Sequence, residues 1–314
     1  MKKINYLQFT AVDGDAKIGL SAATSPDVQY SFDEKNWVTW DYMEITIPHG
    51  STVYLKGNNP KGFSKGILQS NRFRMQGKIE AHGNIMSLIF GEKCDANPTI
   101  PNSCCFESLF QGCISLLTAP EMPATTLTKG CYQFMYGWCC SLSVAPELPA
   151  KDLQRECYKG MFYGCTSLVK APSLLALNLA DCCYSYMFMD CESLVEASEL
   201  PATNLAECCY ISMFEGCKSL VMAPKLPASD LQPECYKRMF FGCKKLEYVY
   251  ALFKDQFHQL STRSWLSGVS KKKKALFVRS PSAKWNDRGT SGIPKGWKVR
   301  TNFKPYRLPD GTYG

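Results

Sequence analysis

A sequence motif of twelve residues recurs six times at a constant spacing of 26 residues, and it constrains the fold more than any other feature of the chain. The copy from Cys157 to Leu168 shows the pattern, and the copy from Cys183 to Leu194 follows it without insertion or deletion. Its first cysteine stands at Cys105, Cys131, Cys157, Cys183, Cys209 and Cys235, and its second at Cys113, Cys139, Cys165, Cys191, Cys217 and Cys243. A fixed period in this range predicts a solenoid, in which each unit buries its apolar face against its neighbours.

The pattern within one unit predicts a helix followed by a short strand. Leu153, Cys157, Met161 and Cys165 are four residues apart, which is the spacing of an apolar stripe on an amphipathic helix. The segment 167–172 then reads as a short extended piece closed by a proline, stable only when it pairs with the same piece of the next unit. The predicted fold class is therefore an α/β solenoid, with short parallel strands on one face and helices on the other.

The sequence of the repeat resembles the BspA-type leucine-rich repeat of bacteria, including gut bacteria, and of their phages. The resemblance rests on Cys-Tyr-x-x-Met, Gly-Cys-x-Ser-Leu and Ala-Pro-Glu-Leu, and it covers roughly residues 84–249. It implies a leucine-rich-repeat array and a non-enzymatic protein of recognition or cell adhesion. Some copies depart from the pattern, such as the fourth, which has Ala197-Ser198 in place of Ala-Pro.

Three sections follow from the positions of the repeats. Residues 1–83 alternate apolar and polar positions in six or seven short runs, which predicts a small all-β sandwich. Its tryptophans, Trp37 and Trp40, are either a sugar-binding patch or ordinary packing, and packing is favoured. Residues 84–250 form the solenoid, with a capping unit before the six repeats. The period is lost after Tyr250, so residues 251–314 are interpreted as a C-terminal cap, helical over 251–266, with a basic tail.

The seventeen cysteines are interpreted as buried free thiols and not as a disulfide framework. On a helix, residues eight apart lie about 12 Å from each other, and neighbouring helices lie about 8–10 Å apart, both too far for a disulfide. Cys-x-x-Cys pairs are absent and there are only three histidines, so no zinc site is predicted. Five cysteines lie outside the two columns, and a disulfide among them stays possible in this interpretation: Cys94, Cys104, Cys140, Cys182 and Cys208.

The net charge of +8 comes from the C-terminal section, because residues 1–104, 105–248 and 249–314 carry +1, −4 and +11. A run of four lysines is a candidate patch for an anionic partner, with a solvated turn as the alternative. Its members are Lys271, Lys272, Lys273 and Lys274.

The chain shows no motif that carries catalysis. It lacks His-Glu-x-x-His, Gly-x-Ser-x-Gly and the phosphate-binding Gly-x-x-x-x-Gly-Lys-Ser/Thr. We therefore expect no enzyme activity, no cofactor and no metal.

The charged N-terminal residues are not followed by an apolar run, so neither a signal peptide nor a membrane span is expected. The expected location is a virion or the cytoplasm, or the bacterial surface if a signal was removed.

The candidate ligand-binding residues lie two positions after the leucine of each unit, where the residue type varies while the surrounding core letters barely change. Together they are Thr118, Val144, Lys170, Glu196, Met222 and Tyr248. In a strand ladder they would form a column with a spacing of about 4.8 Å. The expected partner is a protein or glycan, on a host cell or a virion, and not nucleic acid. Two readings stay open: a recognition module, or a structural virion component whose repeats act as a spacer.

Overall fold

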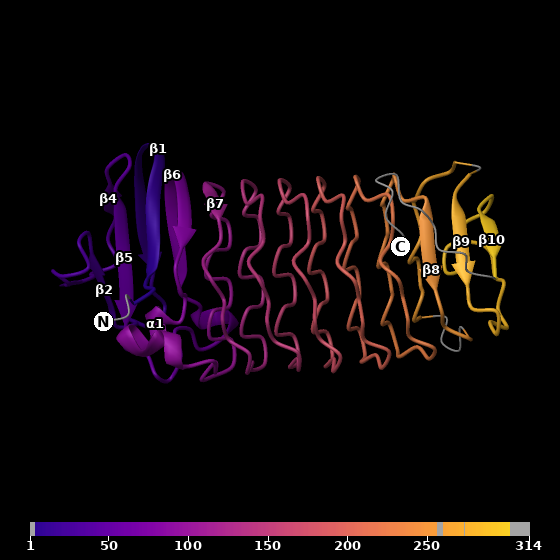
Figure 1. Ribbon diagram of the computed structural model, residues 1–314, viewed down its shortest axis with the longest axis horizontal. Coiled ribbons are helices and arrows are strands. Elements are labelled where there is room, and N and C mark those ends of the chain that lie inside the picture. The colour runs from indigo at the N-terminus through magenta and orange to yellow at the C-terminus, as the bar shows by residue number, and fades with distance from the viewer. Residues whose placement is uncertain (1–3, 256–259, 273, 302–314) are drawn as a thin grey trace.

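The computed structural model describes residues 4–255, 260–272 and 274–301. Strand residues make up 25% of the described part of the chain and helices only 4%, so the predicted α/β class is wrong. Among these described residues the one α-helix is α1 (Ser87–Phe90); a short 3-10 helix, Gly91–Ala96, follows it directly, and another, Ile67–Gln69, lies before β6 (Arg72–His82). The body is a stack of coils between an N-terminal sheet and a smaller C-terminal sheet (Figure 1).

The N-terminal section forms a single mixed sheet and not the predicted sandwich. Its strands are β1 (Leu7–Ser21), β2 (Val28–Ser31), β3 (Val38–Thr39), β4 (Ile45–Ile47), β5 (Thr52–Gly57), β6 (Arg72–His82) and β7 (Leu116–Thr118). The order is β3-β2-β5-β1-β6-β7, with β4 also paired to β1. A second sheet is unnecessary because the repeats cover the apolar side chains. Phe9 and Phe73 pack on Phe110 of the first copy, at 6.1 and 5.2 Å between ring centroids.

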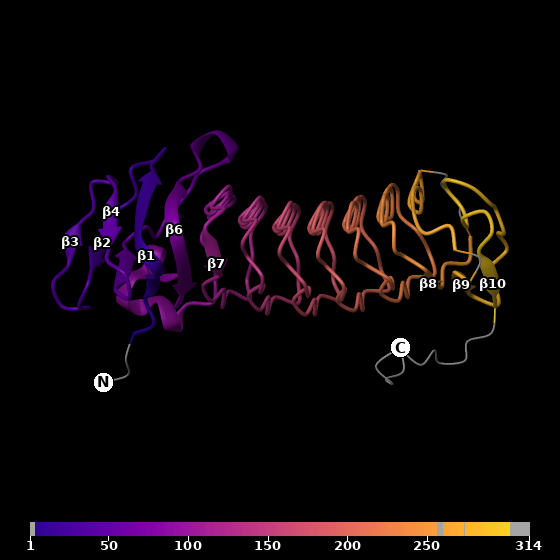
Figure 2. The same ribbon diagram turned by 90° about the horizontal axis from the view of Figure 1, so that it is seen from above.

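The join between sheet and repeats is a pair of parallel strands. Most of the N-terminal sheet is antiparallel, but β6 and β7 run parallel, as the repeats do among themselves. The first coil of the stack therefore pairs directly with strand β6 through β7, and the other coils follow it along the stack (Figure 2).

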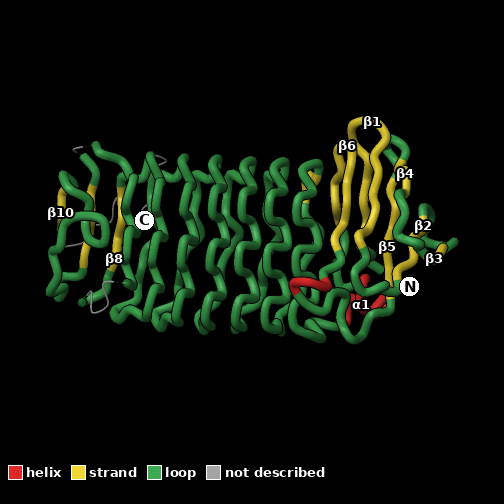
Figure 3. Tube along the Cα trace, turned by 180° about the vertical axis from the view of Figure 1, so that it is seen from behind, coloured by secondary structure: helices red, strands yellow, loops and turns green. Residues whose placement is uncertain are grey.

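The segments predicted as helices are runs of consecutive turns. In the copy from Glu156 to Gly164, alternate N–H groups donate across to the next copy, as Gly160 does to the carbonyl of Ser185 at 2.7 Å. The N–H groups between them donate back three residues, as Met161 does to Tyr158 at 3.2 Å. The middle of the molecule is accordingly drawn as loop, with most strands at its two ends (Figure 3).

The spacing between copies explains why helices are excluded. Neighbouring helices need about 8–10 Å between their axes. The rings of successive copies lie only 5.4–6.0 Å apart, a distance that suits chains joined by hydrogen bonds. Every fourth residue of each run also has positive φ, as at Glu156 (57°), Gly160 (60°) and Gly164 (71°), which an α-helix does not allow.

Two columns of stacked aromatic rings fill the core. One column passes through Phe106, Tyr132, Tyr158, Tyr184, Tyr210 and Tyr236, and the other through Phe110, Tyr136, Phe162, Phe188, Phe214 and Phe240. All of these rings are buried, with planes within 12° of parallel. Every ring between the two ends of a column thus contacts an aromatic neighbour on both sides, in the stacked arrangement that such pairs prefer.

The predicted burial of both cysteine columns is confirmed, and the thiols are free. The second column has a further role, because each thiol from Cys139 onward donates to a carbonyl of the preceding copy and Cys113 donates to a carbonyl of β6. Cys165 Sγ lies 3.1 Å from the Tyr136 carbonyl, and Cys191 Sγ lies 3.1 Å from that of Phe162. Since a disulfide sulfur cannot donate, this arrangement requires the reduced form.

We predict that thiol alkylation of the folded protein stops at a small subset of the cysteines. Cys104, Cys140, Cys182 and Cys208 are half-buried and should react, whereas the twelve column cysteines and Cys94 are buried and should react only after unfolding. Mass spectrometry after alkylation without reductant, in native buffer and in denaturant, counts the two classes. Column cysteines found in disulfides would contradict the reduced core.

The C-terminal section continues the stack although the sequence period is lost there, and its described residues 260–266 form turns in place of the predicted helix. Residues 260–268 form another run of turns, and Tyr236, Phe240 and Gly242 donate N–H groups to it as to any next copy. Beyond it lies a parallel sheet in the order β10-β9-β8, made of β8 (Tyr248–Ala251), β9 (Leu276–Arg279) and β10 (Lys298–Arg300). One continuous buried core extends from Leu7 to Trp297.

Candidate ligand-binding strip on the repeat stack

The candidate residues pair in register at four of the five steps between copies, and within the described residues no bridge is found between Glu196 and Met222. Parallel bridges join Thr118 to Val144, Val144 to Lys170, Lys170 to Glu196, and Met222 to Tyr248. The buried leucine two positions earlier fixes each of them, because it anchors the end of the turn run in the core. Side chains of successive copies thus follow one another along the stack, as parallel pairing requires.

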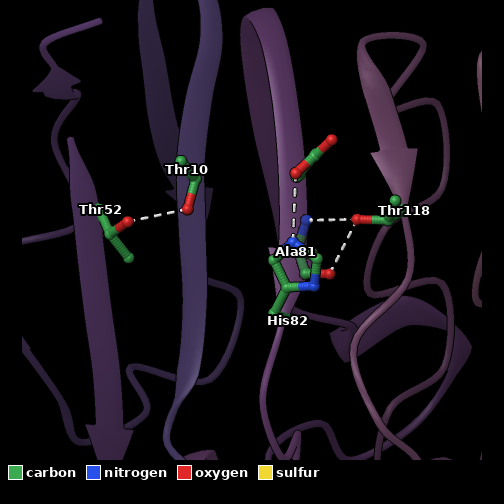
Figure 4. A network of polar contacts seen from close by, with 6 residues as sticks. Thr10, Thr52, Ala81, His82 and Thr118 are labelled. Atoms are coloured by element: carbon green, nitrogen blue, oxygen red, sulfur yellow. Dashed lines mark hydrogen bonds and ion pairs between the residues drawn. The ribbon is translucent and has the colours of Figure 1, made fainter. Parts of the chain in front are cut away.

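Thr118, at the N-terminal end of the column, has a structural role. Its hydroxyl accepts from the Ala81 N–H at 3.0 Å and donates to the Ala81 carbonyl at 2.9 Å (Figure 4). These bonds stand in for ladder bonds at the irregular step between β6 and β7. The same view shows the Thr10–Thr52 hydroxyl pair, 2.8 Å apart, on neighbouring strands β1 and β5. Thr118 is therefore a poor candidate for ligand binding.

The middle of the column is the part that faces solvent. Val144, Lys170 and Glu196 are exposed, whereas Met222 and Tyr248 are half-buried. Lys170 Nζ lies 3.0 Å from Glu196 Oε2, and both side chains are more than 60% exposed. A pair so exposed contributes at most about 1 kcal/mol to stability. Its charges stay available to a ligand at little cost.

Sequence reasoning missed an apolar row directly beside these residues. Val169, Val195 and Val221 are 48%, 46% and 45% exposed, and each immediately precedes a column position. The available signal was the valine after the leucine in copies three to five. We call the exposed set Val144, Val169, Lys170, Val195 and Glu196 the open strip. It combines apolar surface with one positive and one negative charge.

An aromatic cluster on the turn runs was also missed. The ring of Tyr163 makes edge contacts with Trp138 at 4.6 Å and with Phe134 at 6.4 Å. The rings of Phe134 and Trp138 cover the backbones of Gly160 and Gly164 in the next copy, where a β-carbon would collide with them. Trp138 remains 45% exposed. The sequence analysis made no prediction for these three positions, because only the apolar stripe of the supposed helix was interpreted.

The two N-terminal tryptophans serve mainly in packing. Trp40 is buried and donates its indole N–H to the Met43 carbonyl at 2.8 Å. Trp37 is half-buried against Tyr6, at 4.9 Å between ring centroids, and Lys56 Nζ lies 4.3 Å from its ring centroid. The packing interpretation is thus supported over a sugar-binding patch.

The lysine run is partly neutralised. Lys272 and Lys274 both pair with Glu247, the latter at 3.8 Å, while Lys271 is exposed and Lys273 lies outside the described residues. One carboxylate shared between two lysines reduces the positive charge that this patch can offer to an anionic partner.

No protein-family model, curated protein or solved structure matches this chain. Within the part of the chain that the structure describes, no helix is both long and apolar enough to cross a bilayer. The same residues contain no group of three or more His, Cys, Asp or Glu side chains placed to hold a metal ion.

Proposed function

We propose that this chain is a non-enzymatic recognition or adhesion protein that binds a protein or glycan through the open strip of its repeat stack. The observation that carries the proposal is the contrast between buried and exposed positions. The buried residues are nearly identical from copy to copy, whereas the column that includes Val144, Lys170 and Glu196 holds a different residue in every copy. Because the pairing register is fixed, these differences form an ordered surface pattern.

The physical character of the strip suits recognition. Exposed valines supply apolar contact area, and the Lys170 and Glu196 charges can orient a ligand. The resemblance to BspA-type repeats supports the same class of function. On the turn runs, Trp138 is 45% exposed and offers a further aromatic surface to a sugar ring.

A second candidate function is a structural virion component in which the stack is a spacer. The continuous core favours it, since the N-terminal sheet, the repeats and the C-terminal sheet are packed into one body. A body of this kind can hold two attachment points at a constant distance without binding anything along its length.

The test compares two triple-alanine variants of equal chemistry. The first replaces Val144, Lys170 and Glu196 in the column. The control replaces Leu177, Lys129 and Glu207, which are exposed elsewhere on the stack. Binding of labelled protein is measured on glycan arrays and on bacterial cells.

We expect the column variant to bind at least about tenfold more weakly, the loss of some 1.4 kcal/mol in interface contacts, while the control variant binds normally. Both should melt at the temperature of the parent protein, because none of the six side chains is buried. Equal binding by both variants and the parent would favour the spacer function.

A further inference from the structure

The C-terminal end of the stack carries a pocket that plays no part in the proposed recognition surface. Its volume is about 500 Å³, and it is lined by Arg279, Asn286, Arg288, Val299, Arg300 and Thr301. Three of the six lining residues are therefore arginines and two are neutral polar residues. We propose that this pocket binds a tetrahedral oxyanion, the phosphate or sulfate group of a larger ligand.

Sheet topology brings the arginines together. Strands β9 and β10 are parallel, with Arg300 paired to Val278, so Arg300 and Arg279 stand at the same carboxyl end of the sheet. Arg288 comes from the loop between these two strands. In parallel sheets the carboxyl ends of strands are the usual place for ligands, because loops converge there.

Two of the guanidinium groups are held by carbonyl groups of buried tryptophans. Arg279 Nη1 donates to the Trp285 carbonyl, and Arg288 Nη1 donates to the Trp297 carbonyl at 2.9 Å. Both indoles are locked in the core by their own bonds, from Trp285 Nε1 to Phe253 at 3.1 Å and from Trp297 Nε1 to Ser270 at 2.9 Å. The guanidinium groups are thus oriented in advance, which lowers the entropy lost on binding.

Apart from a longer bond from Arg288 Nη1 to the Pro294 carbonyl at 3.3 Å, no further hydrogen bond of these guanidinium groups is found among the described residues. A guanidinium has five N–H donors, so each of these groups keeps several. Arg279 Nε is buried and has no hydrogen-bond partner among the described residues. Among those residues, no carboxylate forms an ion pair with Arg279, Arg288 or Arg300, and Asp287 of the surrounding loop does not line the pocket.

The chemistry of the lining selects the ligand class. Several guanidinium groups around one space suit an anion with three or more acceptor oxygens, which phosphate and sulfate groups provide. Val299 is the one apolar lining residue, which disfavours a lipid or another apolar ligand. The pocket is open to solvent, so the phosphate or sulfate group can belong to a larger molecule that extends beyond it.

The experiment is calorimetric titration of the full chain with inorganic phosphate, sulfate and acetate, followed by glycerol 3-phosphate and methyl sulfate. We expect saturable binding of both tetrahedral ions and much weaker binding of acetate. The two esters then show whether a phosphate or a sulfate ester is the better ligand. Absence of saturable binding by either tetrahedral ion would overturn the proposal.

Two variants on the same strand separate a pocket from a general positive field. Arg300→Gln removes a lining guanidinium, whereas Lys298→Gln removes an equal charge from an exposed residue that does not line the pocket. Both side chains are exposed, and among the described residues neither makes a side-chain hydrogen bond, so both variants should melt like the parent. We expect Arg300→Gln to weaken phosphate binding about tenfold or more and Lys298→Gln to change it less than about twofold. Equal weakening by the two variants would contradict a defined site.

Discussion

Raising the pH above 9 should unfold this protein cooperatively, with a midpoint at about pH 10. The cause is the set of twelve buried column thiols. Burial raises the pKa of Cys113, Cys131, Cys183 and Cys235 from the ordinary 9.0 to about 12, and it raises the pKa of the other eight as well. Each thiol therefore keeps its proton in the folded state at a pH where the unfolded chain releases it.

The sign and size of the change in the free energy of unfolding with pH follow from proton linkage. Between pH 9 and the raised pKa values the folded state binds more protons, so the free energy of unfolding falls as pH rises. Below pH 9 both states hold the protons and the stabilisation is complete. Each thiol costs about 1 kcal/mol between pH 9 and 10, and twelve together cost on the order of 10 kcal/mol. That equals the entire stability of many domains, about 5–15 kcal/mol.

Urea denaturation at half-unit steps from pH 7 to 10.5, with reductant present, measures this dependence. The slope should be near zero up to pH 8 and correspond to several protons released on unfolding above pH 9. Replacing Cys165 and Cys191 with alanine should lower the number of released protons by about two, although it also removes packing. A flat profile to pH 10 would mean that the column thiols are already ionised or oxidised.

The sequence predicted the register of the stack but not the conformation of its turns. Constant spacing alone requires that Lys170 pair with Glu196, and the buried letters follow from the same periodicity. The four-residue spacing of Cys157, Met161 and Cys165 was ambiguous, because an α-helix and a run of four-residue turns place apolar side chains alike. Gly160 and Gly164, also four apart, were the discriminating signal, since glycine is unfavourable inside a helix and suited to positive φ.

The errors at the two ends have one common cause. Each end was interpreted as a separate module because its letters differ from those of the repeat. Phe73 of β6 contributes a ring beside Phe110 and a carbonyl to the thiol of Cys113 at 3.3 Å, as a repeat would. At the other end Trp265 stacks on Tyr236 in the place of the next ring. Backbone pairing and ring stacking tolerate these substitutions, so the stack of coils continues beyond the residues in which the repeat can be recognised from the sequence.

The pocket of arginines could not be predicted from the sequence, because it depends on the parallel pairing of β9 with β10.

Truncation after Tyr250 should convert the protein into aggregates. The cut removes β9, β10 and the turn run 260–268, and so exposes the last repeat. Tyr236, Phe240 and Cys243 are fully buried in the intact chain. Each large apolar side chain returned to water costs about 1.5–3 kcal/mol. The exposed end would also carry a row of unpaired N–H groups, including those of Tyr236 and Phe240, which now donate to Ser261 and Trp265 at 2.9 Å.

Unpaired backbone donors beside exposed rings form a template on which a second chain can stack, so self-association is the expected fate of the truncated protein. The matched control is a chain that ends after Thr301, which keeps the whole C-terminal sheet and the cluster around Trp265 and Trp285. Light scattering during gel filtration should show a sharp species for the control and large particles for the truncation. If the shorter chain elutes like the control and melts at the same temperature, the residues beyond Tyr250 contribute nothing to the stability of the stack. That result would contradict the conclusion that they are needed to cover the last repeat.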